Sequence, residues 1–491
     1  MNPELKRNIL IELTSQRLLA MPVILGLIFA VAWVTEDAAG VITTSEIVFW
    51  LLVFLWGTRK AAGAFGSELA NNTWDSQRLS ALSAGQIFTG KLFGNTSFVL
   101  YGALISILVN AAARLELYAT WLDRPQSIPL RTVVLGPGDI VWSTAHDLLS
   151  AFLGLVVAMF VAVVLMARSR SSKGISVTFC QVFAIGVAGV FADRLGSFVN
   201  TVSGRALTQD ASSFAMANWY GIATPVVWFV IASLVVYLLW AVLGTVRQLR
   251  SVLQFRGYRW AWALFVLFVG VYLAGFDTLY QRAPTFNNSA FVFLTVIWAT
   301  ATLFTYLAVL TETKSLQGYR SYVAAVRRFR VTEIFEFQPF WLTSLMLVAI
   351  ALVVNLAVGQ VQAGVRNEFD PELAELFRVG AASIDVKTLM IVASLFLVRD
   401  CLLVMTLNFG RRRRRADLAA LVYLAALYVI VPLLVRGLDL DQTVLMKFFL
   451  PQVDSGLAAS AWPVVLEVAG LALVMVLRWR AVRQPLAADG I

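Results

Sequence analysis

Long apolar runs alternate with short polar segments along the whole chain. An α-helix rises about 1.5 Å per residue, so roughly 20 apolar residues cross the hydrocarbon core of a bilayer. The pattern therefore predicts an all-α polytopic membrane protein with about 12 transmembrane helices. The spans are expected at 18–35, 45–65, 94–113, 140–166, 175–192, 219–243, 260–277, 289–311, 341–360, 386–409, 417–435 and 459–477.

Three landmarks recur at a nearly constant offset along the chain. Glu68 and Glu312 each end an apolar run, and Asn110 and Asn355 each fall in a later run. The basic turn at 168–173 is matched by the arginine run at 411–415. The offset predicts two six-helix halves of the same topology, 1–250 and 251–491, related by an axis along the membrane normal. Accidental alignment of similar apolar runs is the alternative.

Composition and charge agree with this picture. Hydrophobic residues make up 59% of the 491 residues and charged residues 14%, whereas soluble domains carry about 25% charged residues. The net charge of +10 does not indicate nucleic-acid binding, because the basic residues gather in alternate short loops. This bias places both termini in the cytoplasm. Short loops without eukaryotic targeting signals favour a bacterial inner membrane.

The most informative polar segment is 67–92, which lies between two apolar runs. It contains a Thr-Trp-Asp turn and a short amphipathic patch from Leu79 to Ala84, and it returns to the membrane at Gly90-Lys91-Leu92. We expect it to be a docking loop for a soluble cytoplasmic partner. The candidate contact residues are Glu68, Thr73, Trp74, Asp75, Gln77, Arg78, Leu79, Leu82 and Lys91.

Two features of this loop suggest how it would bind. Trp74 is a candidate anchor for an apolar pocket of the partner, and Asp75 and Arg78 have the i,i+3 spacing of a stiffening ion pair. An ordinary interfacial aromatic and two solvated charges are the simpler interpretation.

The same loop contains a misleading motif, because Gly85 to Lys91 fits GxxxxGK. A phosphate-binding loop follows a buried strand and ends in Ser or Thr, which ligates magnesium. Position 92 is Leu and the segment leads into a membrane span. We therefore expect no nucleotide site in this chain.

Residues 2–17 precede the first span and are amphipathic, which favours a helix lying in the membrane interface. An ordinary charged flank is the alternative.

The order of these segments resembles the membrane subunit of a type-2 ABC exporter. It consists of an interfacial elbow helix, two spans, a cytoplasmic loop ending in Gly90-Lys91-Leu92 and four further spans. The resemblance implies that loop 67–92 is a coupling loop seated on a separate ATPase subunit, which binds ATP and magnesium. Two ATPase copies are expected. Loop 312–340 follows the topology but lacks the TWD and GKL sequences, so whether it docks an ATPase is open.

Charged residues inside spans are candidate functional groups because their desolvation is costly. His146, Asp147 and Glu467 are candidates for a polar cavity that contacts substrate; interhelical hydrogen bonding is the alternative. The single histidine and the two distant cysteines, Cys180 and Cys401, offer no metal or catalytic set, so we expect a non-enzymatic chain.

Two other functions are compatible with the pattern. A 12-helix secondary transporter is one, although the basic turn typical of the major-facilitator class between spans two and three is missing. A non-transporting membrane anchor or assembly subunit of a larger complex is the other. The sequence does not identify a substrate.

Overall fold

The computed structural model describes residues 2–71, 73–80, 82–123, 137–168, 176–189, 216–253, 255, 260–276, 289–312, 314–358, 386–409, 416–438, 444–451 and 456–483. The chain divides into two compact units, Met1–Gly257 and Tyr258–Ile491. The predicted boundary between 250 and 251 falls inside a helix, because the last helix of the first unit continues to Val252. That helix buries Leu249 near its end.

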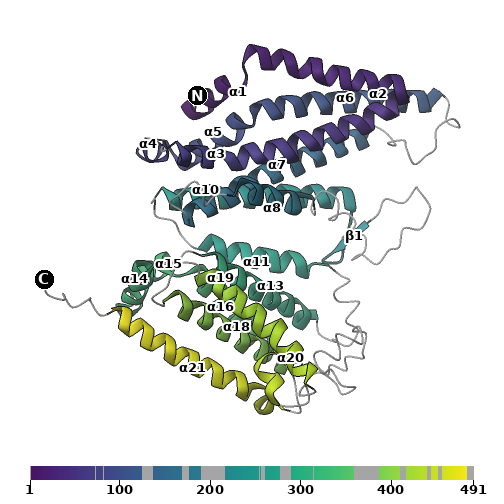
Figure 1. Cartoon of the computed structure of the whole chain (residues 1–491). Coiled ribbons are helices and arrows are strands. Elements are labelled where there is room, and N and C mark those ends of the chain that lie inside the picture. The colour runs from purple at the N-terminus through teal and green to yellow at the C-terminus, as the bar shows by residue number, and fades with distance from the viewer. Residues whose placement is uncertain are drawn as a thin grey trace. The chain divides into compact units, whose positions relative to one another are not determined.

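In its described residues the first unit is helical apart from one hairpin (Figure 1). Its elements are α1 (Pro3–Glu12), α2 (Ser15–Trp50), the π-helix η1 (Leu51–Gly57), α3 (Thr58–Ala70), α4 (Trp74–Arg78), α5 (Ala84–Asn95), α6 (Ser97–Asp123), α7 (Pro137–Arg168), α8 (Val177–Gly189), β1 (Met216–Trp219), β2 (Ile222–Pro225) and α10 (Val226–Val252).

The described part of the second unit is entirely helical apart from its loops. Its elements are α11 (Trp260–Ala274), α13 (Ser289–Thr311), α14 (Leu316–Arg327), α15 (Val331–Phe337), α16 (Phe340–Ala357), α18 (Val386–Asn408), α19 (Ala416–Ala425), the π-helix η4 (Ala426–Ile430), α20 (Val431–Gly437), the 3₁₀-helix η5 (Val444–Phe448) and α21 (Leu457–Arg483).

Helix α2 is bent back on itself at Glu36 and Asp37, which have non-helical backbone angles. Beyond the bend the chain returns as the second half of α2, η1 and α3 (Figure 1). The arms are in contact at the bend, since a Cβ on Gly40 would lie 2.8 Å from the carbonyl oxygen of Ala32. The two arms correspond to the predicted spans 18–35 and 45–65.

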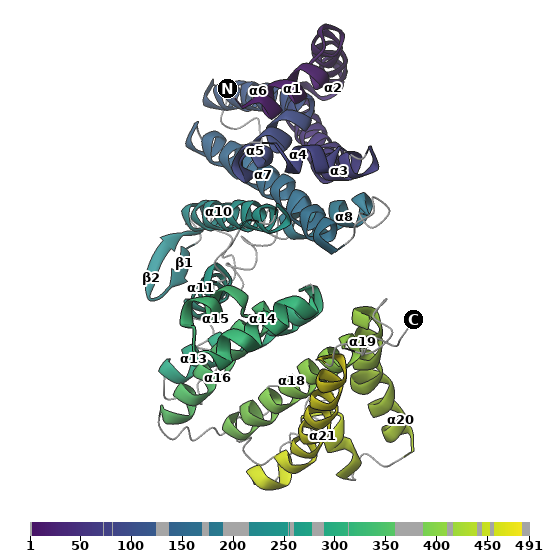
Figure 2. The same cartoon turned by 90° about the vertical axis from the view of Figure 1, so that its left-hand side faces the viewer.

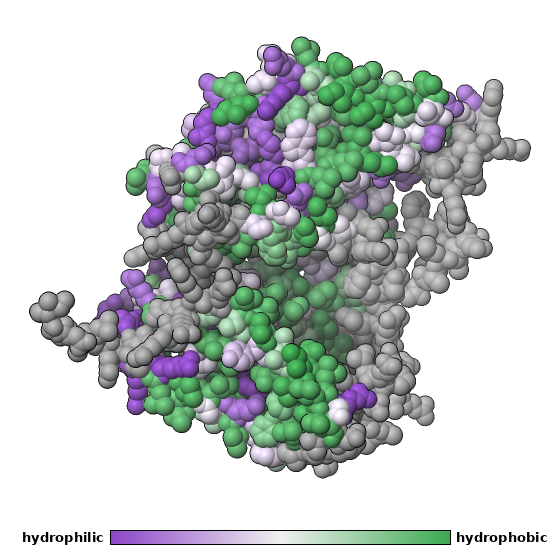
Figure 3. All heavy atoms as spheres, viewed as in Figure 1, coloured by the Kyte–Doolittle hydropathy of each residue, from purple (hydrophilic) through white to green (hydrophobic). Residues whose placement is uncertain are grey.

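In the described residues, nine helices are long and apolar enough to cross a membrane. The first of them comprises both arms of the bend, and α8 and α11 are shorter apolar helices. Hydrophobic residues lie along the helices, and hydrophilic residues gather where α1, α4 and α5 lie (Figure 3). The chain is therefore an all-α polytopic membrane protein, as the apolar pattern predicted. The count of twelve spans and the duplication stay predictions.

The sixth span begins later than predicted. Residues Met216 to Pro225 form a two-stranded antiparallel hairpin beside the start of α10 (Figure 2). Its turn is made by Tyr220 and Gly221, both with positive φ. Two such residues form the tight turn that suits the right-handed twist of paired strands. The helix therefore starts at Val226, instead of at residue 219 as expected.

The two asparagines of the predicted repeat make comparable contacts. The Asn110 amide on α6 donates to the Ile42 carbonyl at 3.0 Å and to the Ser45 hydroxyl at 2.9 Å, near the start of the returning arm of α2. The Asn355 amide on α16 donates to the Thr295 hydroxyl at 3.0 Å, near the start of α13. In each unit the asparagine thus joins the helix before the polar loop to the helix after it. The basic runs at 168–173 and 411–415 fall largely outside the described residues.

Candidate functional site

Helix α1 lies tightly against α5. Asn2 caps α1 by accepting the Glu4 backbone N–H at 3.1 Å, and Pro3 occupies the first turn, where its missing donor costs nothing. Two glycines one turn apart on α5 allow the approach: a Cβ on Gly90 would lie 2.6 Å from Glu4 Cγ, and one on Gly94 would lie 2.5 Å from Asn8 Cβ. The buried face of α1 is therefore polar, since its buried residues are Glu4 and Asn8.

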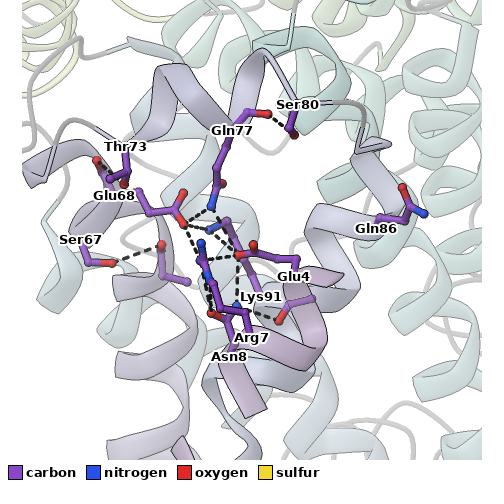
Figure 4. Close-up of polar contacts among 12 residues, drawn as sticks. Glu4, Arg7, Asn8, Ser67, Glu68, Thr73, Gln77, Ser80, Gln86 and Lys91 are labelled. Carbon is purple, nitrogen blue, oxygen red and sulfur yellow. Dashed lines mark hydrogen bonds and ion pairs between the residues drawn. The ribbon is translucent and has the colours of Figure 1, made fainter. Parts of the chain in front are cut away.

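Polar side chains from four helices converge on two carboxylates (Figure 4). The Glu4 carboxylate accepts from Arg7 at 2.9 Å, from Asn8 at 3.1 Å and from Gln77 at 3.4 Å. The Glu68 carboxylate at the end of α3 lies 2.5 Å from the Lys91 ammonium and also accepts from Gln77. The members of this cluster, hereafter the elbow network, are Glu4, Arg7, Asn8, Glu68, Gln77 and Lys91.

The elbow network is balanced in charge, and all its members except Arg7 are buried. Lys91 is 1% exposed and lies 3.6 Å from Glu4 as well as 2.5 Å from Glu68. Arg7 bridges the same two carboxylates from the surface, with Glu68 at 3.5 Å. Two cations therefore face two anions, which offsets the desolvation of each. Two acceptor atoms, Glu68 Oε2 and Gln77 Oε1, are buried without a hydrogen-bond partner.

Trp74 does not serve as the exposed anchor that the sequence suggested. It is 7% exposed and packs edge-on against Phe65 of α3, with ring centroids 6.0 Å apart. The Lys91 ammonium lies 5.2 Å from the centroid of the same Phe65 ring. Trp74 is thus packed inside the fold against Phe65, and it is not available at the surface for a partner.

The loop between α3 and α5 has a small exposed tip. Its helical turn is α4, which ends at Arg78, and the next helix, α5, begins at Ala84. Leu79 is 88% exposed at the end of this turn, and Leu82 is half-buried. Asp75 and Arg78 are exposed, and no ion pair joins these two described residues. The prediction of a stiffening ion pair between them was therefore wrong. Thr73 donates its backbone N–H to the Glu68 carbonyl at 3.0 Å and closes the end of α3.

The GxxxxGK segment forms α5 and no phosphate loop. Ser83 caps this helix and Gln86 completes a capping box, which stabilises the helical start. Lys91 is already paired with Glu68 inside the fold. The segment therefore presents neither the turn nor the free lysine that a nucleotide site requires.

The three predicted cavity residues belong to two different units. In the first unit His146 Nδ1 lies 3.2 Å from the Asp147 carboxylate on α7. In the second unit Glu467 of α21 accepts from Arg399 of α18 at 3.0 Å. Glu467 thus links two helices within its own unit, which agrees with the interhelical alternative; the shared cavity stays a prediction.

Arg399 lies in a dense polar cluster within the second unit. It is 2% exposed and donates to the adjacent Asp400 at 2.9 Å and to the Phe448 carbonyl at 2.7 Å. Asp400 also accepts the hydroxyls of Tyr306 and Tyr428, at 2.7 and 2.6 Å. These contacts connect α13, α18, η4, η5 and α21, as expected of charged groups held inside a membrane bundle.

The second loop closes by different chemistry. Glu312 accepts the Phe340 backbone N–H at 2.8 Å, and Lys314, 2% exposed, lies 2.5 Å from Asp417. Helix α14 packs inward through Tyr319, which accepts from the Trp341 indole at 2.9 Å. Burial raises the pKa of the Tyr322 phenol on the same helix above its ordinary value.

Sequence reasoning missed Glu4, Arg7 and Asn8. Their i, i+3 and i+4 spacing places all three on one side of α1, and the Gly90 and Gly94 pair on α5 has the matching interval. That double pattern was a usable signal for a polar helix–helix contact. In the described residues no group of His, Cys, Asp or Glu has the arrangement of a metal site.

Comparisons with models of known protein families, with curated proteins and with solved structures find no match to this chain.

Proposed function

We propose that this chain is the membrane subunit of an ATP-driven ABC transporter of the exporter type, and that loop 67–92 couples it to a separate cytoplasmic ATPase. The observation that supports this proposal is the elbow network. A loop that only connects two spans has no need of a buried lysine paired with two carboxylates from different helices.

The network would make the loop a rigid lever. Buried charge-assisted contacts join α1, α4 and α5 to the end of α3, whose other end continues into the membrane through η1. A displacement of the tip would then move the spanning helix, instead of being absorbed by a flexible loop. This is the mechanical requirement for coupling ATP binding to an inward–outward switch.

The tip itself suits a small docking contact. Leu79 is 88% exposed, and Asp75 and Arg78, of opposite charge, are exposed on the helical turn just before it. An apolar centre with a polar rim is the usual anatomy of a protein interface. ATP and magnesium would be bound by the partner, expected in two copies, and the transported substrate is not identified.

The test is affinity purification of the tagged chain in mild detergent, followed by mass spectrometry. A near-stoichiometric ATPase subunit is expected. Leu79→Ser should weaken its retention, because loss of an apolar anchor costs about 2 kcal/mol, roughly 30-fold in affinity. Leu10→Ser, at a position on α1 that is 66% exposed, is the control and should retain the ATPase.

The opposite results separate the other functions. A monodisperse chain that elutes alone would indicate a secondary transporter. Co-elution with proteins other than an ATPase would indicate a membrane anchor of a larger complex.

A further inference from the structure

The turn between α14 and α15 carries an unusual residue. The α14 helix ends with the Phe329 N–H donating to the Val326 carbonyl and the Arg330 N–H to the Ala325 carbonyl, each at 3.1 Å. This pair of bonds is a Schellman cap, whose left-handed position is usually glycine. Here that position is Phe329, with φ of 51°.

The side chain explains why a bulky residue is tolerated there. Phe329 is 86% exposed and makes no contribution to the core of the unit. A glycine would adopt this conformation with less strain. The Phe329 ring is therefore held outside the fold, where it is available for contact with a surface beyond the protein chain.

The surface around Phe329 is both apolar and basic. Val331 and Phe335 of α15 are 62% and 63% exposed, and α15 has no buried residue. Arg327 and Arg328 precede the ring and are exposed. Arg330 follows it, is exposed, and pairs with Glu333 of α15 at 2.7 Å, so the turn carries a net positive charge. The basic turn is defined here as residues 326–335.

We propose that the basic turn lies on the anionic lipid surface of the membrane, with Phe329 and Phe335 among the headgroups and Arg327 and Arg328 on lipid phosphates. Helix α15 is followed by only Gln338 and Pro339 before the spanning helix α16, so the chain holds this surface near the bilayer. Exposed aromatics combined with basic residues are typical of interfacial segments, and anionic lipids attract them.

Lipid suits this surface better than a protein partner. The inner face of α14 is already used by Tyr319 and Ala325, whereas the apolar side chains of Phe329, Val331 and Phe335 remain uncovered. Those uncovered residues follow one another immediately before a membrane span. By contrast, the Leu79 tip combines one leucine with one acidic and one basic residue, so it carries no net positive charge.

An environment-sensitive fluorophore tests the proposal. It is attached to Phe329→Cys in the full chain in nanodiscs of phosphatidylcholine, with or without phosphatidylglycerol. Cys180 and Cys401 are buried, which favours labelling of the introduced thiol. With phosphatidylglycerol, we expect emission to shift to the blue, quenching by lipid-borne nitroxide, and protection from aqueous iodide.

Two controls make the result decisive. A label at Leu79→Cys should remain accessible to iodide in both nanodiscs, and Arg327→Gln with Arg328→Gln and Arg330→Gln should return the label at 329 to water. Phe329→Gly should leave thermal stability unchanged or higher while reducing the number of phosphatidylglycerol molecules retained in native mass spectrometry.

Iodide accessibility at 329 equal to that at 79 in both nanodiscs would overturn the proposal. So would protection that depends on an added ATPase and not on lipid. Neither measurement requires the partner of the Leu79 tip, so this proposal and the coupling proposal can fail separately.

Discussion

Lys91 shows most clearly how one side chain depends on its surroundings. Its ammonium is 1% exposed and faces Glu4 and Glu68, so its charge is tolerated only because both carboxylates are present. The converse also holds, since each carboxylate would be left with less compensation if Lys91 were removed. Removing one partner of a buried pair is far more costly than never burying the pair.

We expect Lys91→Met, which keeps the approximate volume but removes the charge, to destabilise the first unit by about 3–5 kcal/mol. The measurement is thermal unfolding of the purified protein in detergent. Arg17→Gln is the matched control: Arg17 is 48% exposed in its pair with Glu12, so the loss should be at most about 1 kcal/mol. Equal shifts in the two variants would contradict the role assigned to the network.

Among the elements, α1 and α5 are coupled by backbone proximity as well as by charge. Asn8 adds a hydrogen bond to the Gly90 carbonyl at 3.2 Å, and Asn2 donates to the Gln86 carbonyl at 2.6 Å. These contacts require that α5 present no side chain at the crossing. Gly90 and Gly94 therefore matter because they let α1 approach α5 closely enough for the elbow network to form.

Gly94→Ala should push α1 away from α5, because the new Cβ would lie 2.5 Å from Asn8 Cβ. We expect faster hydrogen–deuterium exchange of the α1 amides, measured by mass spectrometry. Gly85→Ala is the control on the same helix, since its Cβ would meet only Ser83 Oγ at 4.0 Å. Protection of α1 in the Gly94 variant equal to that in the Gly85 variant would show that the crossing tolerates a methyl group.

At the scale of the whole molecule, the charge bias predicts which side each loop faces. We expect Asp37→Cys, at the bend of α2, to react with a membrane-impermeant maleimide added to intact cells. Leu79→Cys and a cysteine appended after Ile491 should react only once the membrane is opened. Labelling of the appended cysteine from outside would mean an odd number of crossings after Leu79, and would exclude the predicted topology.

The membrane class and the approximate position of most spans follow from the sequence, because hydrophobic runs of spanning length report directly on their solvent. Exceptions arose where local geometry intervened. The hairpin at Tyr220 and Gly221 delayed the sixth span, and the helical turn of the polar loop falls at Trp74–Arg78, before the amphipathic patch. Such boundaries depend on turn conformation, which hydropathy does not encode.

The partners of the polar residues were decided by the tertiary structure. The sequence marked Glu68, Gln77 and Lys91 as a group but missed Glu4 and Asn8, and it offered Trp74 as exposed when it is buried. The local sequence around a charged residue or a tryptophan is the same whether that side chain is exposed to water or packed against another helix. By itself the sequence determined that the chain lies in a membrane and that a polar segment separates two of its apolar runs. Only the packing of α1, α3, α4 and α5 decided which side chains are paired inside the fold and which remain at the tip, because burial depends on residues distant along the chain.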